Sequence, residues 1–372
     1  MFNVYGLKVN VVKQLVYLST RLLVNLSTCQ LVFSLHSRNS SFTCQLVISL
    51  ALTINRSRHR WWMVLSAVFA LALTGCMSSR NLLAEENDCY LFSYFNGNGD
   101  GLHLAYSTDG LTWHALRNDT VWLRPEVGKG RLMRDPSIVQ DNNGVFHMVW
   151  TCGWWEQGIG YASSNDLIHW SSQQYIPVME TFEGTRNTWA PELFFDRKSE
   201  MFYIIWASTV PGAFPDIPTS ERERGLNHRQ YYVTTKDFKT FSKTKLFFEP
   251  GFSVIDGFVL QKDKHYYLFV KNENSAPPEK NLRMTGNSKP YDFPVEVSAP
   301  ITGNYWAEGP AALQVGGYVY VYFDKYTQRK FGAVRSRDMV EWEDVSDSVS
   351  FPQGIRHGTA FRVDAKVVEM LK

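Results

Sequence analysis

Cysteine is scarce in this sequence, which has five among 372 residues. Cys29 and Cys44 lie in a segment rich in leucine, valine and serine near the start, and Cys76 ends an apolar run. Cys89 and Cys152 therefore remain for the rest of the chain. Two cysteines do not make a disulfide framework, and the sequence leaves open whether these two pair or stay as buried thiols.

The net charge is small, and segments with helical periodicity and long apolar runs are rare. The formal charge is +2 and no basic stripe crosses the body of the chain, which gives no reason to expect a nucleic-acid partner. Helical spacing of apolar residues is visible only in Ala365–Lys372. Aromatic residues, by contrast, make up 15% of the sequence, which suggests flat stacking surfaces as well as core. The length allows one large all-β domain or two ordinary domains.

The start of the chain differs from the rest. Residues 1–55 contain a near-duplication, Thr28–Leu35 and Thr43–Leu50. We interpret this segment as an over-extended gene start, and the alternative is a membrane-associated or β-rich prodomain.

Residues 56–76 have the order of an export signal. A basic stretch precedes the apolar Met63–Leu73, which is too short to span a bilayer, and Leu-Thr-Gly-Cys follows, ending at Cys76. This order resembles the signal of bacterial lipoproteins, in which the cysteine becomes the lipidated N-terminus. We therefore expect a lipoprotein of the bacterial cell envelope (periplasmic or cell surface), held at the membrane by lipid at Cys76 only. Residues 77–88 would be a tether and 89–372 one domain.

From Cys89 onward, short runs rich in Val, Ile, Tyr, Phe and Trp alternate with clusters of Gly, Asn and Asp, which is typical of β-strands and turns. The sequence predicts strands at Tyr90–Phe95, Leu102–Ser107, Phe146–Cys152, Met201–Ser208, Tyr231–Thr235, His265–Lys271, Tyr318–Asp324 and Phe331–Ser336.

A turn motif recurs four times after such strands. A strand ends in Ser or Thr, an Asp follows, and an aromatic residue stands four places later, which predicts a tight turn that begins at the Asp. The copies are Tyr106–Trp113, Ser163–Trp170, Thr234–Phe241 and Arg335–Trp342.

Polar residues also recur directly before apolar strands, at intervals of roughly 50–65 residues, the size of a four-stranded propeller blade. These residues are Asp135, Glu192, Asp256, Glu308 and His357. The sequence thus predicts an all-β fold, a five-bladed β-propeller. Its last blade would combine an inner strand at His357–Val363 with outer strands from Cys89–Leu116, so that both chain ends close the ring and remove exposed sheet edges.

In such a ring the five strand starts occupy equivalent positions and meet in one pocket. Each motif alone is more often a turn than a catalytic group, but their recurrence favours a shared site. Carboxylates gathered in a small cavity are desolvated and repel each other, which raises at least one pKa, as a general acid at neutral pH requires.

The motifs at these positions resemble those of glycoside hydrolase family 43. They are Arg134-Asp135-Pro136, Trp189-Ala190-Pro191-Glu192, Ile255-Asp256 and Ala307-Glu308-Gly309-Pro310, and the resemblance covers about Cys89–Val363. The family consists of five-bladed propellers, includes α-L-arabinofuranosidases and β-xylosidases, and works by inversion. The resemblance implies that Asp135 is the general base, Glu308 the general acid and Asp256 the residue that tunes and holds the acid. Gly257 departs from the family, which often has Pro or Ala after this Asp.

Further residues are candidates for substrate binding. Trp155, Trp189 and Trp306 offer flat rings for the apolar face of a sugar, although core packing is the alternative for the last two. Glu192 is a candidate acceptor for sugar hydroxyls, and Arg356 a partner for a site carboxylate.

Two further features have open interpretations. The resemblance suggests that His357 helps to hold a structural calcium in the central channel, and the alternative is a satisfied polar residue; no cofactor is expected to be required. The loop Pro211–Arg229 is predicted to wall the pocket, with Asn227, His228 or Arg229 facing substrate, or else to be a plain surface loop.

The function predicted is therefore an inverting, exo-acting hydrolase of terminal α-L-arabinofuranosyl or β-xylosyl residues on plant-type oligo- or polysaccharide, acting as a monomer. A β-fructosidase-like propeller hydrolase is one alternative, although its nucleophile motif is missing near the start of the domain. A sialidase fits the turn repeat but not the blade count. A surface lipoprotein that binds glycan without cleaving it is the alternative from a different class.

Overall fold

The computed structural model describes residues 29–35, 44–50, 88–219, 221 and 223–372. The predicted signal segment and Cys76 lie outside these ranges. Two compact units are present, Met1–Ser79 and Arg80–Lys372. In the first, the near-duplicate segments form strands β1 (Cys29–Leu35) and β2 (Cys44–Leu50), which pair antiparallel. Within the described residues there is no helix that is both long and apolar enough to cross a membrane.

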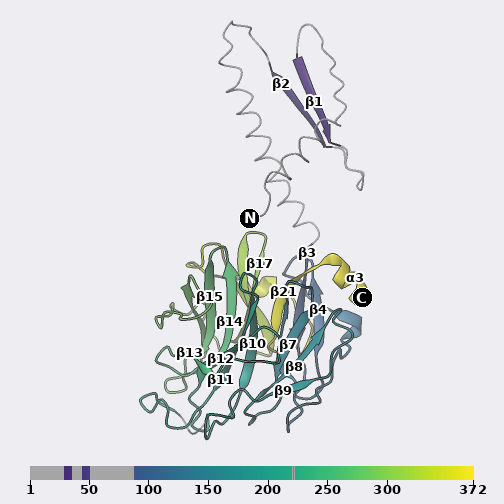
Figure 1. The fold of residues 1–372 in the computed structure, drawn as a ribbon. Helices are drawn as coiled ribbons and strands as arrows, with labels where there is room; N and C mark the ends of the chain where they lie inside the picture. Colours follow the sequence, from purple (N-terminus) through teal and green to yellow (C-terminus); the bar gives the residue numbers. More distant parts are fainter. Residues whose placement is uncertain (1–28, 36–43, 51–87, 220, 222) are drawn as a thin grey trace, which may run out of the picture. The chain divides into compact units, whose positions relative to one another are not determined.

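The second unit is built from five antiparallel sheets, the blades of a propeller (Figure 1). The first blade consists of β6 (Arg134–Gln140), β7 (Phe146–Thr151), β8 (Ile159–Ser164) and β9 (Gln174–Ile176). The second consists of β10 (Trp189–Asp196), β11 (Met201–Ser208), β12 (Arg229–Thr235) and β13 (Lys245–Phe248).

The third blade has three strands, in keeping with the missing copy of the turn motif in this part of the sequence. These strands are β14 (Val254–Lys262), β15 (His265–Asn272) and β16 (Asn281–Asn287). The fourth blade consists of β17 (Glu308–Val315), β18 (Tyr318–Lys325), β19 (Lys330–Ser336) and β20 (Glu343–Asp344).

Both ends of the unit form the fifth blade, as predicted. Its sheet order is β21 (Thr359–Asp364), β3 (Asp88–Tyr94), β4 (His103–Ser107) and β5 (His114–Ala115). The single helix in the described part of this unit, α3 (Ala365–Leu371), packs on β3 and β21, and two short 3₁₀ turns cover Leu116–Asn118 and Ser346–Ser348.

The inner strands close the ring. Each of β6, β10, β14, β17 and β21 contacts the next in this order, and β21 contacts β6. Large aromatic and aliphatic side chains fill the spaces between blades, for example Trp150, Trp206 and Tyr322, all at most 1% exposed. The predicted five-bladed propeller is therefore confirmed.

The turn motif also forms as predicted. In the first copy, Oδ1 of Asp109 accepts hydrogen bonds from the backbone N–H groups of Leu111 and Thr112, both at 2.8 Å. Asp166, Asp237 and Asp338 make the same pair of bonds in the other copies. Such turns satisfy backbone donors that a tight reversal leaves unpaired.

Cys89 and Cys152 are both buried, and Cys152 is a free thiol, so these two cysteines do not pair with each other. Burial raises the pKa of the Cys152 thiol to about 12, so it stays protonated and acts as a small apolar side chain.

Candidate active site

A β-bulge interrupts four of the inner strands near their start. In β6, Arg134 pairs with Thr151 and Ser137 with Val149, so three steps along one strand match two along the other. The same shift occurs in β10, β14 and β17. The residue after the first pair has positive φ in each case: Asp135 (52°), Ala190 (46°), Asp256 (53°) and Gly309 (64°). Such bulges re-aim side chains next to active sites, which suits a site at this end of the channel.

This register corrects one expectation from the sequence. The polar residues do not occupy equivalent positions, because only Asp135 and Asp256 stand at the bulge itself. Glu308 precedes the bulge residue by one position, Glu192 follows it by two, and His357 lies two residues before β21 begins. Since neighbouring residues of a strand point to opposite faces, these offsets give the side chains different directions and depths.

Asp135 is 8% exposed and bonded on both oxygens. Oγ1 of Thr151 donates to Oδ2 at 2.9 Å, and Nδ1 of His357 lies 3.4 Å from Oδ1. Burial opposes ionisation, but the hydrogen bond and charge of His357, with Arg134 and Thr151, hold the pKa of Asp135 below its usual value. Asp135 is therefore a carboxylate at neutral pH, as a general base must be.

Asp256 is also buried, and Oδ2 accepts the backbone N–H of Gly309 at 3.0 Å. Burial raises the pKa of Asp256 to about 6; His357 and Lys271 oppose this, while the negative charges of Glu308 and Asp135 add to it. The bond to Gly309 joins Asp256 to the segment that carries Glu308.

Glu308 has a cation at each oxygen. Nζ of Lys271 lies 2.9 Å from Oε2, and Nη2 of Arg356 lies 3.1 Å from Oε1. Arg356 also donates from Nε to Oδ2 of Asp324 at 2.5 Å, so it pairs with a site carboxylate as expected. Burial and the charge of Glu308 raise the pKa of Asp324 to about 6, although Arg356 and His357 counteract them.

His357 stands between the acidic groups. Burial lowers its pKa, but the hydrogen bond to Asp135 and the charges of Asp256, Asp135 and Glu308 outweigh this and raise it to about 9. The three carboxylates predicted from the motifs are thus brought together around one imidazolium ring.

The donor set around His357 does not fit the expected calcium. Calcium takes six to eight oxygen ligands, whereas here a protonated imidazole faces Asp135. The described part of the chain contains no group of three or more His, Cys, Asp or Glu side chains able to hold a metal ion.

Glu192 is also buried, with 5% of its surface exposed. Oγ1 of Thr359 donates to its Oε2 at 3.3 Å, which links β10 to β21, two inner strands that are not neighbours in the ring. Burial raises the pKa of Glu192 to about 8, against the opposing effects of Ser137, His357 and Thr359. A neutral Glu192 therefore joins β10 to β21 across the ring.

A cavity of about 390 Å³ lies beside this site. Its lining residues are Trp154, Trp155, Trp189, Glu223, Arg224 and Leu226. Trp189 Nε1 donates to the backbone oxygen of Trp154 at 2.8 Å, and Trp155 is 48% exposed. Two of the predicted sugar platforms therefore share one cavity, while Trp306 lies apart, half-buried with its ring 5.9 Å from that of Tyr326.

The loop before β12 walls this cavity as predicted, but through different residues. Glu223, Arg224 and Leu226 line it. His228 and Arg229 are buried, and Asn227 Nδ2 donates to the backbone oxygen of Phe214 at 2.8 Å, so these residues hold the loop in place.

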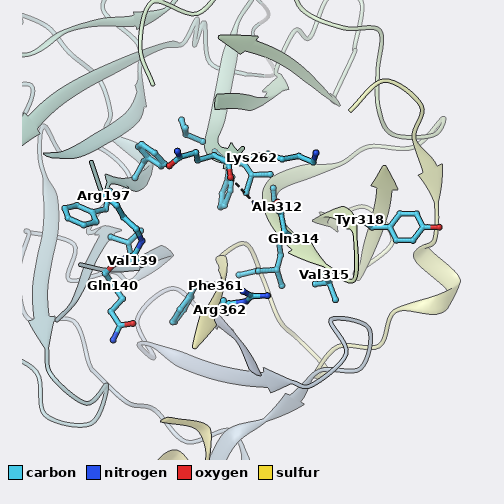
Figure 2. A pocket seen from close by; sticks show the side chains of 18 of the residues that line it. Val139, Gln140, Arg197, Lys262, Ala312, Gln314, Val315, Tyr318, Phe361 and Arg362 are labelled. Atoms are coloured by element: carbon cyan, nitrogen blue, oxygen red, sulfur yellow. Dashed lines mark hydrogen bonds between the residues drawn. The ribbon is translucent and has the colours of Figure 1, made fainter. Parts of the chain in front are cut away.

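A larger opening of about 620 Å³ lies at the other end of the channel (Figure 2). It is lined by residues from the later parts of all five inner strands, such as Val139, Ala312 and Phe361, and by none of the predicted site residues.

Several site residues were not predicted. Lys271 and Asp324 pair directly with the strand starts Ile255 and Glu308 across β14–β15 and β17–β18, and Thr151 pairs with Arg134. A signal was present, because two of the predicted strands end at Lys271 and Asp324. Because the first two strands of a blade are antiparallel, a charged residue at the end of the second strand lies beside the start of the first strand.

The family model described as "Probable glycosyl hydrolase domain", related to glycoside hydrolase family 43, matches residues 85–369. The chain belongs to this family. The five-bladed propeller and the gathering of Asp135, Asp256 and Glu308 around His357 agree with that membership.

Individual relatives are distant from this glycosyl hydrolase. An α-L-arabinofuranosidase of Bifidobacterium longum is 23% identical over 190 residues, which is 45% of this chain and 18% of that protein. The match thus spans less than a fifth of the curated relative.

Solved structures include an α-L-arabinofuranosidase from Lactobacillus brevis with 16% identity, covering 57% of this chain and 72% of that one, at a TM-score of 0.46. A xylan β-1,4-xylosidase from Bacillus halodurans has 19% identity, covers 57% of this chain and 41% of that one, and has a TM-score of 0.41.

Proposed function

We propose that this glycosyl hydrolase removes terminal α-L-arabinofuranosyl or β-xylosyl residues from plant-type polysaccharide with inversion of the anomeric centre, acting as an exo-enzyme. The observation that carries the proposal is the convergence of Asp135, Asp256 and Glu308 around His357. A relative described as an arabinofuranosidase supports the choice of sugar.

In the proposed reaction Asp135 is the general base. Its lowered pKa leaves it ionised, and one oxygen faces His357 while the other faces Thr151, which fixes the carboxylate plane. A water molecule attacks the anomeric carbon, its proton passes to Asp135, and the glycosidic C–O bond breaks on the opposite face of the sugar.

Glu308 is the proposed general acid and gives its proton to the departing oxygen. An inverting pair needs room for water between acid and base, about 6.5–9.5 Å, which residues on different blades can provide. Asp256 would tune and hold the acid, because it binds the backbone of Gly309, the residue next to Glu308. Trp155 and Trp189 would stack on the sugar chain.

We further propose that the protein is a monomeric lipoprotein of the bacterial cell envelope, bound by lipid at Cys76, and that it needs no cofactor. The order of basic residues, apolar run and Leu-Thr-Gly-Cys supports the anchor. Mass spectrometry of the mature N-terminus should show a lipidated Cys76, and an unmodified residue upstream of it would overturn this part.

The reaction can be tested with a panel of aryl arabinofuranosides and xylosides. The variants Asp135→Asn and Glu308→Gln should lose at least about 100-fold in kcat/KM, the usual size of a general acid–base contribution, and the exposed Glu341→Gln should not. NMR of the first-formed sugar should show the inverted anomer. Full activity in either variant, or a retained anomer, contradicts the proposal.

Glycan binding without cleavage remains the alternative class. The acidic triad and the ionised state of Asp135 favour hydrolysis. Binding of an oligosaccharide by the wild type with no turnover on any glycoside in the panel would favour the alternative.

A further inference from the structure

Charged side chains of alternating sign form a continuous series of ion pairs through the site. The series runs through Glu223, Lys280, Glu273, Lys271, Glu308, Arg356 and Asp324. It begins in the loop that walls the tryptophan cavity, crosses the third blade, reaches the proposed acid and ends on β18.

The central links are short. Nζ of Lys280 lies 2.7 Å from Oε1 of Glu273 and 3.2 Å from Oε1 of Glu223. Nζ of Lys271 lies 2.7 Å from Oε2 of Glu273 and 2.9 Å from Oε2 of Glu308. Glu273 thus uses one oxygen for each lysine, and Glu308 uses one for Lys271 and one for Arg356.

The two lysines are unusual because each is 2% exposed. Moving an ammonium ion out of water costs several kcal/mol, and well-packed apolar side chains often serve stability equally well, so a buried ion series is weak evidence for a stabilising role. Such groups are best attested where they fix one geometry among several. The geometry fixed here is that of the Glu308 carboxylate, which has an anchored cation at both oxygens.

The outer end of the series lies where substrate would bind. Glu223 lines the cavity with Trp155 and Trp189, and it contacts Lys280. Nζ of Lys280 also donates a hydrogen bond to the backbone oxygen of Glu273 at 3.1 Å. Only Lys280, Glu273 and Lys271 separate Glu223 from Glu308. Each of these three contacts its two neighbours directly.

We propose that Lys271 and Glu273 are positioning residues for Glu308, and that the series couples the order of loop 211–229 to the orientation of the Glu308 carboxylate. The inference rests on the proposed role of Glu308 as the acid. It assigns a function to Lys271, Glu273 and Lys280, three buried side chains that take no part in the proposed reaction itself.

Charged and titratable groups face Glu308 from several elements that pack against it. They are Lys271 on β15, Asp256 on β14, Asp324 on β18 with Tyr326 after it, and Arg356 and His357 before β21. Lys271→Met removes one of three cations and leaves the others.

The first experiment separates kcat from KM. Lys271→Met should lower kcat with little change in KM, because one oxygen of Glu308 loses the cation that holds it while Arg356 still holds the other. Lys271→Arg, which keeps the charge, should recover kcat. The matched control is Lys325→Met, because Lys325 is 6% exposed, lies 3.6 Å from the ring centre of Tyr305, and the acidic groups that act on its pKa are Asp344 and Asp347, which lie outside the series. An unchanged kcat in Lys271→Met, or an equal loss in Lys325→Met, overturns the positioning role.

The second experiment needs no turnover. Hydrogen–deuterium exchange should be faster across loop 211–229 in Glu273→Gln than in the wild type and unchanged in Lys325→Met. Equal exchange in Glu273→Gln and wild type overturns the coupling. If the wild type cleaves none of the glycosides, the proposed function fails, while the exchange result still decides whether the network orders the loop.

Discussion

Oδ2 of Asp256 accepts the backbone N–H of Gly309 at 3.0 Å, so a carboxyl group of the third blade holds the bulge of the fourth. Gly309 follows Glu308 directly, and its φ of 64° belongs to the left-handed region. A Cβ added at this position would lie 2.4 Å from Cγ of His357. One glycine therefore allows Asp256, Glu308 and His357 to approach each other.

Gly309→Ala should impair both stability and catalysis. The positive φ alone costs about 1 kcal/mol for a residue with a Cβ, and the contact with His357 adds to it. Urea unfolding and kcat on an aryl glycoside measure the two effects.

The matched control for this glycine is Gly316→Ala. Gly316 also has positive φ, 53°, but a Cβ there would meet nothing within 4 Å. Gly316→Ala should lower the free energy of unfolding by about 1 kcal/mol and leave kcat unchanged. Equal kcat in the two variants would show that the approach to His357 is unimportant.

Glu192→Gln should stabilise the protein in a pH-dependent way. The folded-state pKa of Glu192, about 8, exceeds the ordinary value of 4.5. The free energy of unfolding of the wild-type protein therefore falls as pH rises from 4.5 to 8. Glutamine mimics the neutral form, so the variant should gain about 3 kcal/mol at pH 7 relative to its difference at pH 4. Urea unfolding at both pH values tests this, and a difference that does not change with pH would contradict it.

His357→Gln should show the opposite behaviour. The pKa of His357 is raised from 6.5 to about 9, so its ionic contacts stabilise the wild type fully below pH 6.5 and are lost as pH rises through 9. The free energy of unfolding of the variant should lie below that of the wild type by about 3 kcal/mol near pH 6, and this difference should shrink above pH 9. Denaturant melts across this range measure it, and a constant deficit would mean that His357 is not protonated in the folded protein.

Tryptophans of the cavity and of the turn repeat should differ in what they control. Trp155 is 48% exposed, so Trp155→Ala should raise KM about tenfold with little change in Tm. Trp342 belongs to the turn repeat and lies edge-on to Phe269 with ring centres 5.9 Å apart. Trp342→Ala should lower Tm and leave KM unchanged, and the reverse pattern would contradict the assignment.

The fold was predictable because its signals are local. Strands such as Met201–Ser208 are recognisable from composition, and the turn at Asp109 from its own motif. Ring closure by β21 and β3 followed from counting strand starts.

The site was predictable only in part. The motifs located Asp135, Asp256 and Glu308, but the depth of each carboxyl depends on a bulge, which shifts the register by one residue and leaves no distinct mark in composition. The pairing of Lys271 with both Glu273 and Glu308 depends on that register and on the packing of two blades. The wall of the cavity was assigned to the wrong residues of its loop because a loop has no periodicity from which burial can be inferred.

The register of the closing blade separates the start of the propeller from its catalytic mouth. Thr359 pairs with Ser93 near the acidic end of the channel, whereas Asp364 pairs with Asp88 at the opposite end of the same two strands. The first residue of β3 therefore lies away from Asp135 and Glu308, and the strand that opens the propeller leaves the approach to these carboxylates clear.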